Sequence, residues 1–174
     1  PGSGVGIVHL ANGDVNGDGN MDIVTANYQT DSASILLGNG NSTFVRPTSV
    51  PLGDGTKMVA LADMNNDGKL DLVSLNALGN NISIALGNGN GTFLPAVNKA
   101  ISNASSLKQF EITDLNGDGN LDVLTGGSSI VFSMGNGDGS LRASTQIADS
   151  IVLGFALGDA NKDGTQDIVA FKES

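Results

Sequence analysis

Four short segments of the chain share one nine-residue pattern, Asp-x-Asn-x-Asp-Gly-x-x-Asp. Side-chain oxygens at positions 1, 3, 5 and 9, with a backbone carbonyl at position 7, are hard ligands of the kind that Ca²⁺ prefers. Glycine at position 6 permits the sharp turn that such a loop needs. The pattern therefore predicts up to four Ca²⁺ sites. The candidate ligand positions are Asp14, Asn16, Asp18, Asn20, Asp22, Asp63, Asn65, Asp67, Lys69, Asp71, Asp114, Asn116, Asp118, Asn120, Asp122, Asp159, Asn161, Asp163, Thr165 and Asp167.

The position-7 residues differ from loop to loop, which is expected if only their backbone carbonyls face the ion. They are Asn20, Lys69, Asn120 and Thr165. Position 9 is always aspartate, and we expect this carboxylate to close the cage around the ion. Magnesium is a weaker alternative, because its strict octahedral geometry fits a long flexible loop less well.

The distribution of charge favours cation binding. The formal net charge is −10, and twelve of the 18 acidic residues lie in the four loops. Four divalent cations would bring the net charge to about −2. Only 8 lysine and arginine residues are present, which argues against a nucleic-acid-binding surface. No apolar stretch approaches the ~18 residues of a membrane span, so membrane insertion is not expected.

Two other kinds of structure could contain such loops. Solvated Asp-Asn-Gly turns are common, but four copies at intervals of 49, 51 and 45 residues are poorly explained by chance. An EF-hand needs a glutamate at position 12 and flanking helices. Position 12 here is occupied by Thr25, Ser74, Thr125 and Ala170, so the EF-hand is rejected.

A second motif recurs at a nearly fixed distance behind the first. Residues 38–44 begin 24 positions after Asp14, residues 87–93 begin 24 after Asp63, and residues 135–141 begin 21 after Asp114. Their Gly-Asn-Gly starts lack the lysine and the following helix of a phosphate-binding loop, so we interpret them as hairpin turns. A fourth copy would fall beyond the last residue, and the last unit is therefore expected to be truncated.

Short apolar runs between the motifs, rich in β-branched residues, predict strands. Four strands in each unit match one blade of a propeller (~40–50 residues), and the blades should stack face to face to bury both sides of each sheet. The predicted strands are 6–11, 22–26, 33–37 and 44–50 in the first unit; 58–62, 71–75, 82–86 and 93–99 in the second; 109–113, 122–125, 130–134 and 141–148 in the third; and 151–157 and 167–171 in the last.

The two motifs in register resemble the FG-GAP, or VCBS, repeat of integrin α-subunit propellers, fungal propeller lectins and many bacterial secreted proteins. Residues 37–44 and 86–93 match its Leu-Gly-Asn-Gly-x-Gly-x-Phe segment, whereas Leu141 replaces the phenylalanine in the third unit. The resemblance implies an all-β propeller with blades of four antiparallel strands. It also implies Ca²⁺ ligation by the side chains at positions 1, 3, 5 and 9 of each loop.

The domain organisation expected on this basis is a single repeat domain over residues 1–174. Its units would cover residues 5–52, 53–103, 104–148 and 149–174. Such propellers usually have seven blades, and this chain supplies about three and a half. It is expected to be a fragment of a longer propeller, or to complete a ring with other propeller segments or a second copy.

The resemblance implies a secreted, extracellular or cell-surface module that binds a glycan or a protein in adhesion. The alternative is a non-catalytic spacer or scaffold in a larger secreted protein. No Ser, His and Asp grouping with a known catalytic signature is present, so no enzyme activity is expected. His9, the single histidine, is interpreted as structural, and Tyr28 as ordinary packing rather than a sugar-stacking residue.

Overall fold

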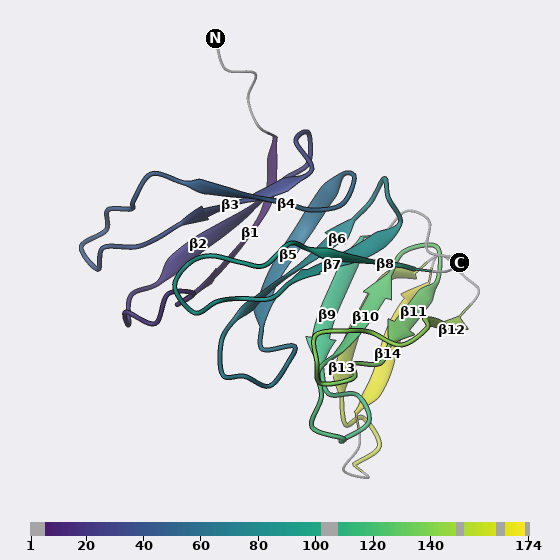
Figure 1. Ribbon diagram of the computed structural model, residues 1–174. Helices are drawn as coiled ribbons and strands as arrows, with labels where there is room; N and C mark the ends of the chain where they lie inside the picture. Colours follow the sequence, from purple (N-terminus) through teal and green to yellow (C-terminus); the bar gives the residue numbers. More distant parts are fainter. Residues whose placement is uncertain (1–5, 102–107, 149–151, 163–165, 173–174) are drawn as a thin grey trace.

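The computed structural model describes residues 6–101, 108–148, 152–162 and 166–172. These residues form three four-stranded antiparallel sheets and one two-stranded sheet, and they contain no helix. Figure 1 shows the sheets side by side in sequence order, from purple to yellow. Within each four-stranded sheet, neighbouring strands are also consecutive in the sequence. The all-β architecture with blades of four antiparallel strands is therefore confirmed.

The strands have the following bounds. The first sheet contains β1 (Ile7–Gly13), β2 (Asp22–Asn27), β3 (Ser32–Leu36) and β4 (Thr48–Pro51). The second contains β5 (Thr56–Ala62), β6 (Asp71–Asn76), β7 (Asn81–Ala85) and β8 (Val97–Ala100). The third contains β9 (Gln109–Thr113), β10 (Asp122–Gly126), β11 (Ile130–Ser133) and β12 (Thr145–Ala148), and the last sheet pairs β13 (Val152–Gly158) with β14 (Asp167–Lys172).

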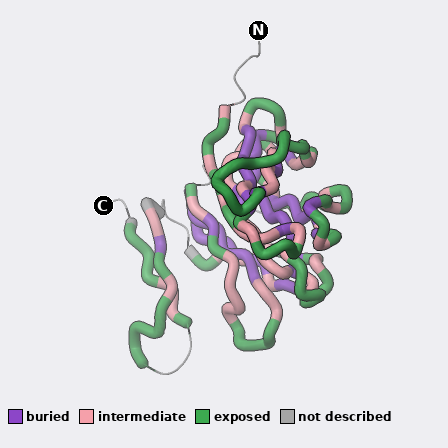
Figure 2. The backbone as a smooth tube through the Cα atoms, turned by 90° about the vertical axis from the view of Figure 1, so that its left-hand side faces the viewer, coloured by how far each residue is buried: buried purple, intermediate pink, exposed green. Residues whose placement is uncertain are grey.

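The hydrophobic core is divided into layers between neighbouring sheets. Val24 and Ile35 of the first sheet pack with Val59 and Leu72 of the second. The opposite face of the second sheet packs against the third, and a smaller cluster around Leu124 joins the third sheet to β13 and β14. Figure 2 shows the buried residues in the middle of the stacked sheets, whereas the turns and much of the outer strands are exposed. The expected face-to-face stacking is confirmed.

The middle strands explain why both faces of a sheet must be covered. Every residue of β6 is buried, so its alternating side chains serve two different cores. Leu72 packs toward the first sheet, whereas Val73 belongs to the cluster shared with the third. A single sheet could not bury both sets, and the stacked arrangement follows from this pattern.

The predicted fourth strands were too long at their beginnings. Phe44, the first residue of the predicted strand 44–50, instead forms an isolated bridge with Gly38, and β4 starts only at Thr48. The same bridge joins Phe93 and Leu141 to the glycines that open their turns. Prolines follow in two of the units, at positions 47 and 95, where the missing N–H interrupts the ladder.

Other strand boundaries shift by one or two residues. β1, for example, extends to Gly13 rather than ending at residue 11. Residue 151, the predicted start of the final pair, lies outside the described residues. None of the described segments could cross a membrane as a long apolar helix.

Candidate metal centre

The acidic loops connect the first strand of each sheet to the second. The first three span residues 14–21, 63–70 and 114–121, and the described part of the fourth begins at residue 159. Because each loop follows the same strand of its sheet, the loops lie at one common end of the stacked sheets (Figure 1). The sheets thus hold the first three loops in equivalent positions.

The position-1 aspartate organises the backbone of its own loop. Asp14 accepts hydrogen bonds from the N–H groups of Gly17 at 2.7 Å and Gly19 at 2.8 Å. These bonds lower the pKa of Asp14, the bond from Gly19 having the largest effect. Asp114 accepts the equivalent bonds from Gly117 and Gly119, both at 2.8 Å. The loop is therefore already folded around this carboxylate.

The position-9 aspartate connects the two sequence motifs. Asp71 is completely buried, and its two oxygens accept the N–H groups of Met64 and Gly87, each at 2.8 Å. Met64 belongs to the acidic loop, whereas Gly87 opens the second motif. Asp22 and Asp122 are likewise completely buried and make the equivalent pairs of bonds. This shared bond explains why the second motif follows the first at a nearly fixed distance.

Position 6 requires glycine because of its backbone conformation. Gly19, Gly68 and Gly119 have φ between 80° and 84°, and no atom lies within 4 Å of where a Cβ would stand. Space is therefore available, and the left-handed φ alone favours glycine, as predicted. Position 4 is also left-handed, a feature that sequence analysis missed. Its signal was present in the sequence, since position 4 holds glycine or asparagine in the first three loops: Gly17, Asn66 and Gly117.

Each loop also contacts the next sheet. The carbonyl of Val15 in the first loop accepts the N–H of Gly91, which lies in the second motif of the following sheet, at 3.0 Å. The carbonyl of Met64 accepts the N–H of Gly139 at the same distance. In addition, Asn66 donates to the side chain of Asn120 in the third loop at 3.0 Å. The first two loops therefore bond both to the turn of their own sheet and to the turn of the next.

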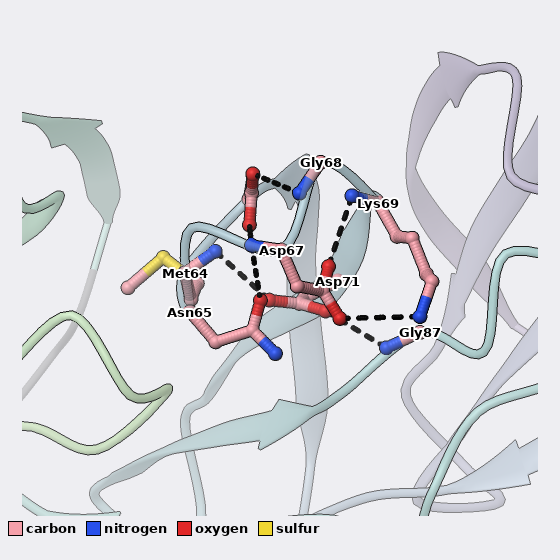
Figure 3. A network of polar contacts seen from close by, with 8 residues as sticks. Met64, Asn65, Asp67, Gly68, Lys69, Asp71 and Gly87 are labelled. Atoms are coloured by element: carbon pink, nitrogen blue, oxygen red, sulfur yellow. Dashed lines mark hydrogen bonds and ion pairs between the residues drawn. The ribbon is translucent and has the colours of Figure 1, made fainter.

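The charged side chains of the second loop affect one another's pKa values. Figure 3 shows the hydrogen bonds of this loop. Asp67 accepts the backbone N–H of Lys69 at 3.0 Å, which is the main cause of its lowered pKa. The Lys69 ammonium lies 3.3 Å from Asp67 Oδ2 and lowers this pKa further. Burial raises the pKa of Asp71 above its usual value. The N–H groups of Gly87 and Met64 oppose that rise, and the negative charges of Asp67 and Asp63 add to it.

The donor types of these loops suit a hard cation such as Ca²⁺. At positions 1, 3, 5 and 9, each of the first three loops offers three carboxylates and one carboxamide. A carboxylate oxygen that accepts one N–H keeps a second lone pair. Among the described residues, however, no three Asp, Glu or His side chains gather closely enough to hold a metal. The carboxylates are directed instead toward backbone N–H groups, as described for Asp14 and Asp71. The oxygen donors of the loops therefore fit Ca²⁺. That these donors come together around one ion stays a prediction.

The fourth loop is described only in part. Asp163 and Thr165, two of its predicted ligand positions, lie outside the described residues. Asp167 accepts the N–H groups of Ala160 and Asn161 at 2.9 and 3.2 Å, so the link from position 9 back to the loop is preserved. Asp159 is exposed at the end of the preceding strand.

Comparisons with solved structures identify the class of fold. The chain resembles a lectin of Agrocybe aegerita that recognises non-reducing terminal N-acetylglucosamine, with a TM-score of 0.68 and 21% identity over 97% of this chain and 48% of that one. It also resembles the V. cholerae biofilm matrix protein Bap1, with a TM-score of 0.55 and 24% identity over 92% of this chain and 27% of that one. A third similar structure is BBS1N in complex with ARL6DN, with a TM-score of 0.60 and 15% identity over 94% of this chain and 50% of that one.

These similarities and the stacked four-stranded sheets define a β-propeller-type repeat domain. The FG-GAP-like repeat matches three times, at residues 14–74, 63–125 and 115–170, and the chain therefore belongs to that family. It spans half or less of the length of the three solved structures. No curated protein matches its sequence.

Proposed function

We propose that this chain is a non-catalytic binding module whose acidic loops bind Ca²⁺ and thereby hold neighbouring propeller blades together. The observation that carries the proposal is the double attachment of the loops. Asp71 bonds its loop to the turn of its own sheet, and Met64 O bonds the same loop to the turn of the next. A cation that fixes the loop would stabilise two sheets at once.

Electrostatics support a cation in these loops. Three carboxylates occur within nine residues of each loop, and the chain carries a formal net charge of −10. Like charges at such short separations repel, and a divalent ion replaces that repulsion with attraction. Calcium is the preferred candidate because the donor atoms are all oxygens and Ca²⁺ accepts irregular arrangements of its ligands more readily than Mg²⁺.

We further propose that the module acts outside the cell or at its surface, where Ca²⁺ is abundant enough to saturate loops of modest affinity (about 10⁻⁴–10⁻³ M). Its ligand would be a glycan or a protein. Support comes from the similar structures, which include a glycan-binding lectin, a biofilm matrix protein and a complex with another protein. A propeller-type scaffold presents its turns as a rigid binding surface.

The test is thermal unfolding in millimolar CaCl₂ and in excess EDTA. We expect chelation to lower the Tm by many degrees, because ions bound only to the folded state stabilise it. Asp67→Ala and Asp118→Ala should each reproduce part of that loss in calcium and have little effect in EDTA. Ala substitution of Asp54, an exposed aspartate outside the four loops, is the matched control. A Tm that is the same with and without Ca²⁺ would contradict the proposal.

The binding role is tested separately from the metal. A glycan array probed with the calcium-loaded protein should give reproducible binding to a limited set of sugars. A module that only spaces or scaffolds other domains should bind none of them, and this is the alternative function that we retain. Metal-dependent turnover of a glycan by the purified chain would contradict the non-catalytic assignment.

A further inference from the structure

The third turn of the second motif differs from the first two in one polar contact. All three turns begin with Gly-Asn-Gly, at residues 38–40, 87–89 and 135–137. In the third turn, Arg142 Nε donates a hydrogen bond to Asn136 Oδ1 at 3.0 Å. Valine and leucine occupy the equivalent positions 45 and 94. Among the described residues, no donor reaches the side-chain oxygen of Asn39 or Asn88.

The amide nitrogen of Asn136 is held in a way that all three turns share. Its Nδ2 donates to Ser140 Oγ at 2.8 Å, and Ser140 Oγ donates to Asp138 Oδ1 at 2.6 Å. Asn39 and Asn88 donate in the same way to a threonine hydroxyl, at 2.8 and 2.9 Å. The guanidinium at Oδ1 is therefore what distinguishes the third turn around its asparagine.

An asparagine followed by glycine can lose its side-chain amide without an enzyme. The glycine nitrogen attacks the asparagine Cγ, and the missing Cβ of glycine leaves this approach open. The new N–Cγ bond forms, the Cγ–Nδ2 bond breaks and ammonia leaves. The glycine N–H proton passes to a solvent base, and solvent protonates the departing nitrogen. Water then opens the resulting succinimide to aspartate or isoaspartate.

The attacking nitrogen is occupied in several of the Asn-Gly pairs outside the strands. In the first and third acidic loops, this N–H donates to the position-1 aspartate at 2.7 and 2.8 Å. The N–H of Gly91 donates to the carbonyl of Val15 at 3.0 Å. By contrast, the N–H of Gly137 has no protein acceptor among the described residues, and the same holds for Gly40 and Gly89. The turns are therefore the places where attack is least hindered.

We infer that Asn136 is a self-modification site, at which Arg142 accelerates conversion of the side-chain amide to aspartate or isoaspartate. Attack by Gly137 N places negative charge on Asn136 Oδ1, which is the atom that Arg142 contacts. A donor aimed at developing negative charge lowers the barrier, and a charged donor does so more strongly. One such donor contributes ~100-fold or more in a closed active site. Asn136 and Arg142 are both exposed, so solvent weakens the effect.

Conversion would change the charge beside the third acidic loop. A carboxylate at position 136 would stand where Arg142 now contacts a neutral amide and would form an ion pair with it. Arg142 also acts on that loop. The N–H of Asn120 has the largest effect in lowering the pKa of Asp118, and the Arg142 guanidinium lowers this pKa further. The isoaspartate product would in addition lengthen the backbone by one carbon inside the turn that the Gly135–Leu141 bridge closes.

The experiment is incubation of the purified protein in heavy-oxygen water at mildly alkaline pH, followed by peptide mass spectrometry. Each conversion exchanges ammonia for water and incorporates one heavy oxygen atom. We expect Asn136 to convert at least about fivefold faster than Asn39 and Asn88. The rate should rise with pH, because hydroxide removes the proton of the attacking nitrogen.

Exchange of one residue between turns tests the role of Arg142. Arg142→Leu introduces the residue of the second turn and should slow Asn136 to about the rate of Asn88. The reciprocal Leu94→Arg should accelerate Asn88. Asp138→Asn introduces the residue of the first two turns, is the matched control, and should leave Asn136 the faster site. An unchanged Tm before incubation shows that each variant is folded.

Three outcomes would overturn the inference. The first is conversion of Asn39 or Asn88 as fast as Asn136. The second is an Arg142→Leu protein in which Asn136 converts as fast as before or faster, since Arg142 would then only restrain the turn. The third is loss of the difference in Asp138→Asn. None of these measurements involves a metal or a sugar, so their failure would leave the proposed function unaffected.

Discussion

At the scale of single residues, the aspartates of the nine-residue pattern have two different structural roles. Exposed aspartates such as Asp67 have side chains available to a cation, whereas Asp71 is buried and bonded to two backbone N–H groups. Both residues are aspartates of the same nine-residue motif. Their substitution should therefore have different consequences for stability.

Asp71→Ala should destabilise the protein even without metal. It leaves the N–H groups of Met64 and Gly87 without their acceptor in a buried environment, which we expect to lower the free energy of unfolding by about 2–4 kcal/mol. Urea denaturation in EDTA measures this difference directly. Asp67→Ala under the same conditions is the control and should unfold close to wild type. Equal effects of the two substitutions in EDTA would refute the division of roles.

At the scale of the elements, the turns of the second motif act as connectors between sheets. Gly91 and Gly139 have φ of 80° and 82° and donate to the loop of the preceding sheet. A Cβ on Gly139 would approach Leu86 to 2.6 Å, and one on Gly91 would approach Leu37 to 2.9 Å. The equivalent position in the first unit is Ser42, which tolerates a φ of 66° with a side chain present.

Gly139→Ala should lower the free energy of unfolding by roughly 1–3 kcal/mol, because it adds both left-handed strain and a collision with Leu86. Ser42→Gly, at the equivalent turn, should be neutral or slightly stabilising because it removes strain and no contact between sheets. Chemical denaturation of both variants checks the prediction. A stable Gly139→Ala protein would show that this close approach does not constrain the sheets.

At the scale of the whole molecule, stability is shared among interfaces between neighbouring sheets. The last sheet is attached through the cluster around Leu124 and through Gln109. The Gln109 amide donates to Phe155 O at 3.0 Å and accepts the Phe155 N–H at 3.1 Å. The outer faces at the two ends remain exposed, as seen for Leu10 in β1 and Phe171 in β14. Stacked repeats of this kind tend to open locally from their ends.

Gln109→Leu should release the last sheet without unfolding the others. We expect faster amide hydrogen exchange in β13 and β14, because two hydrogen bonds between sheets are lost, and unchanged exchange in β6 and β7. Met58→Leu provides the control, since Met58 is the residue of β5 at the position equivalent to Gln109 and is apolar. Uniform acceleration across all the sheets would show that the molecule unfolds only as one unit.

Much of this architecture could be predicted from local sequence. The acidic pattern located the loops, glycine located the left-handed position 6, and apolar runs located the strands, because each signal depends on nearby residues. The starts of the fourth strands were wrong, since the bridges from Phe44, Phe93 and Leu141 to their turns depend on hairpin geometry.

The sequence alone determined the repeat, its strands and the oxygen-rich loops, because these are encoded in short segments with fixed spacing. Only the tertiary structure revealed that Asp71 joins two motifs, that Gly91 and Gly139 contact the preceding loops, and that Lys57 and Lys108 line one cavity. Lys57 and Lys108 occupy the same position in successive repeats, six residues before Asp63 and Asp114, but the repeat alone does not show that these positions meet. They line the same cavity because neighbouring sheets must stack to bury both of their faces.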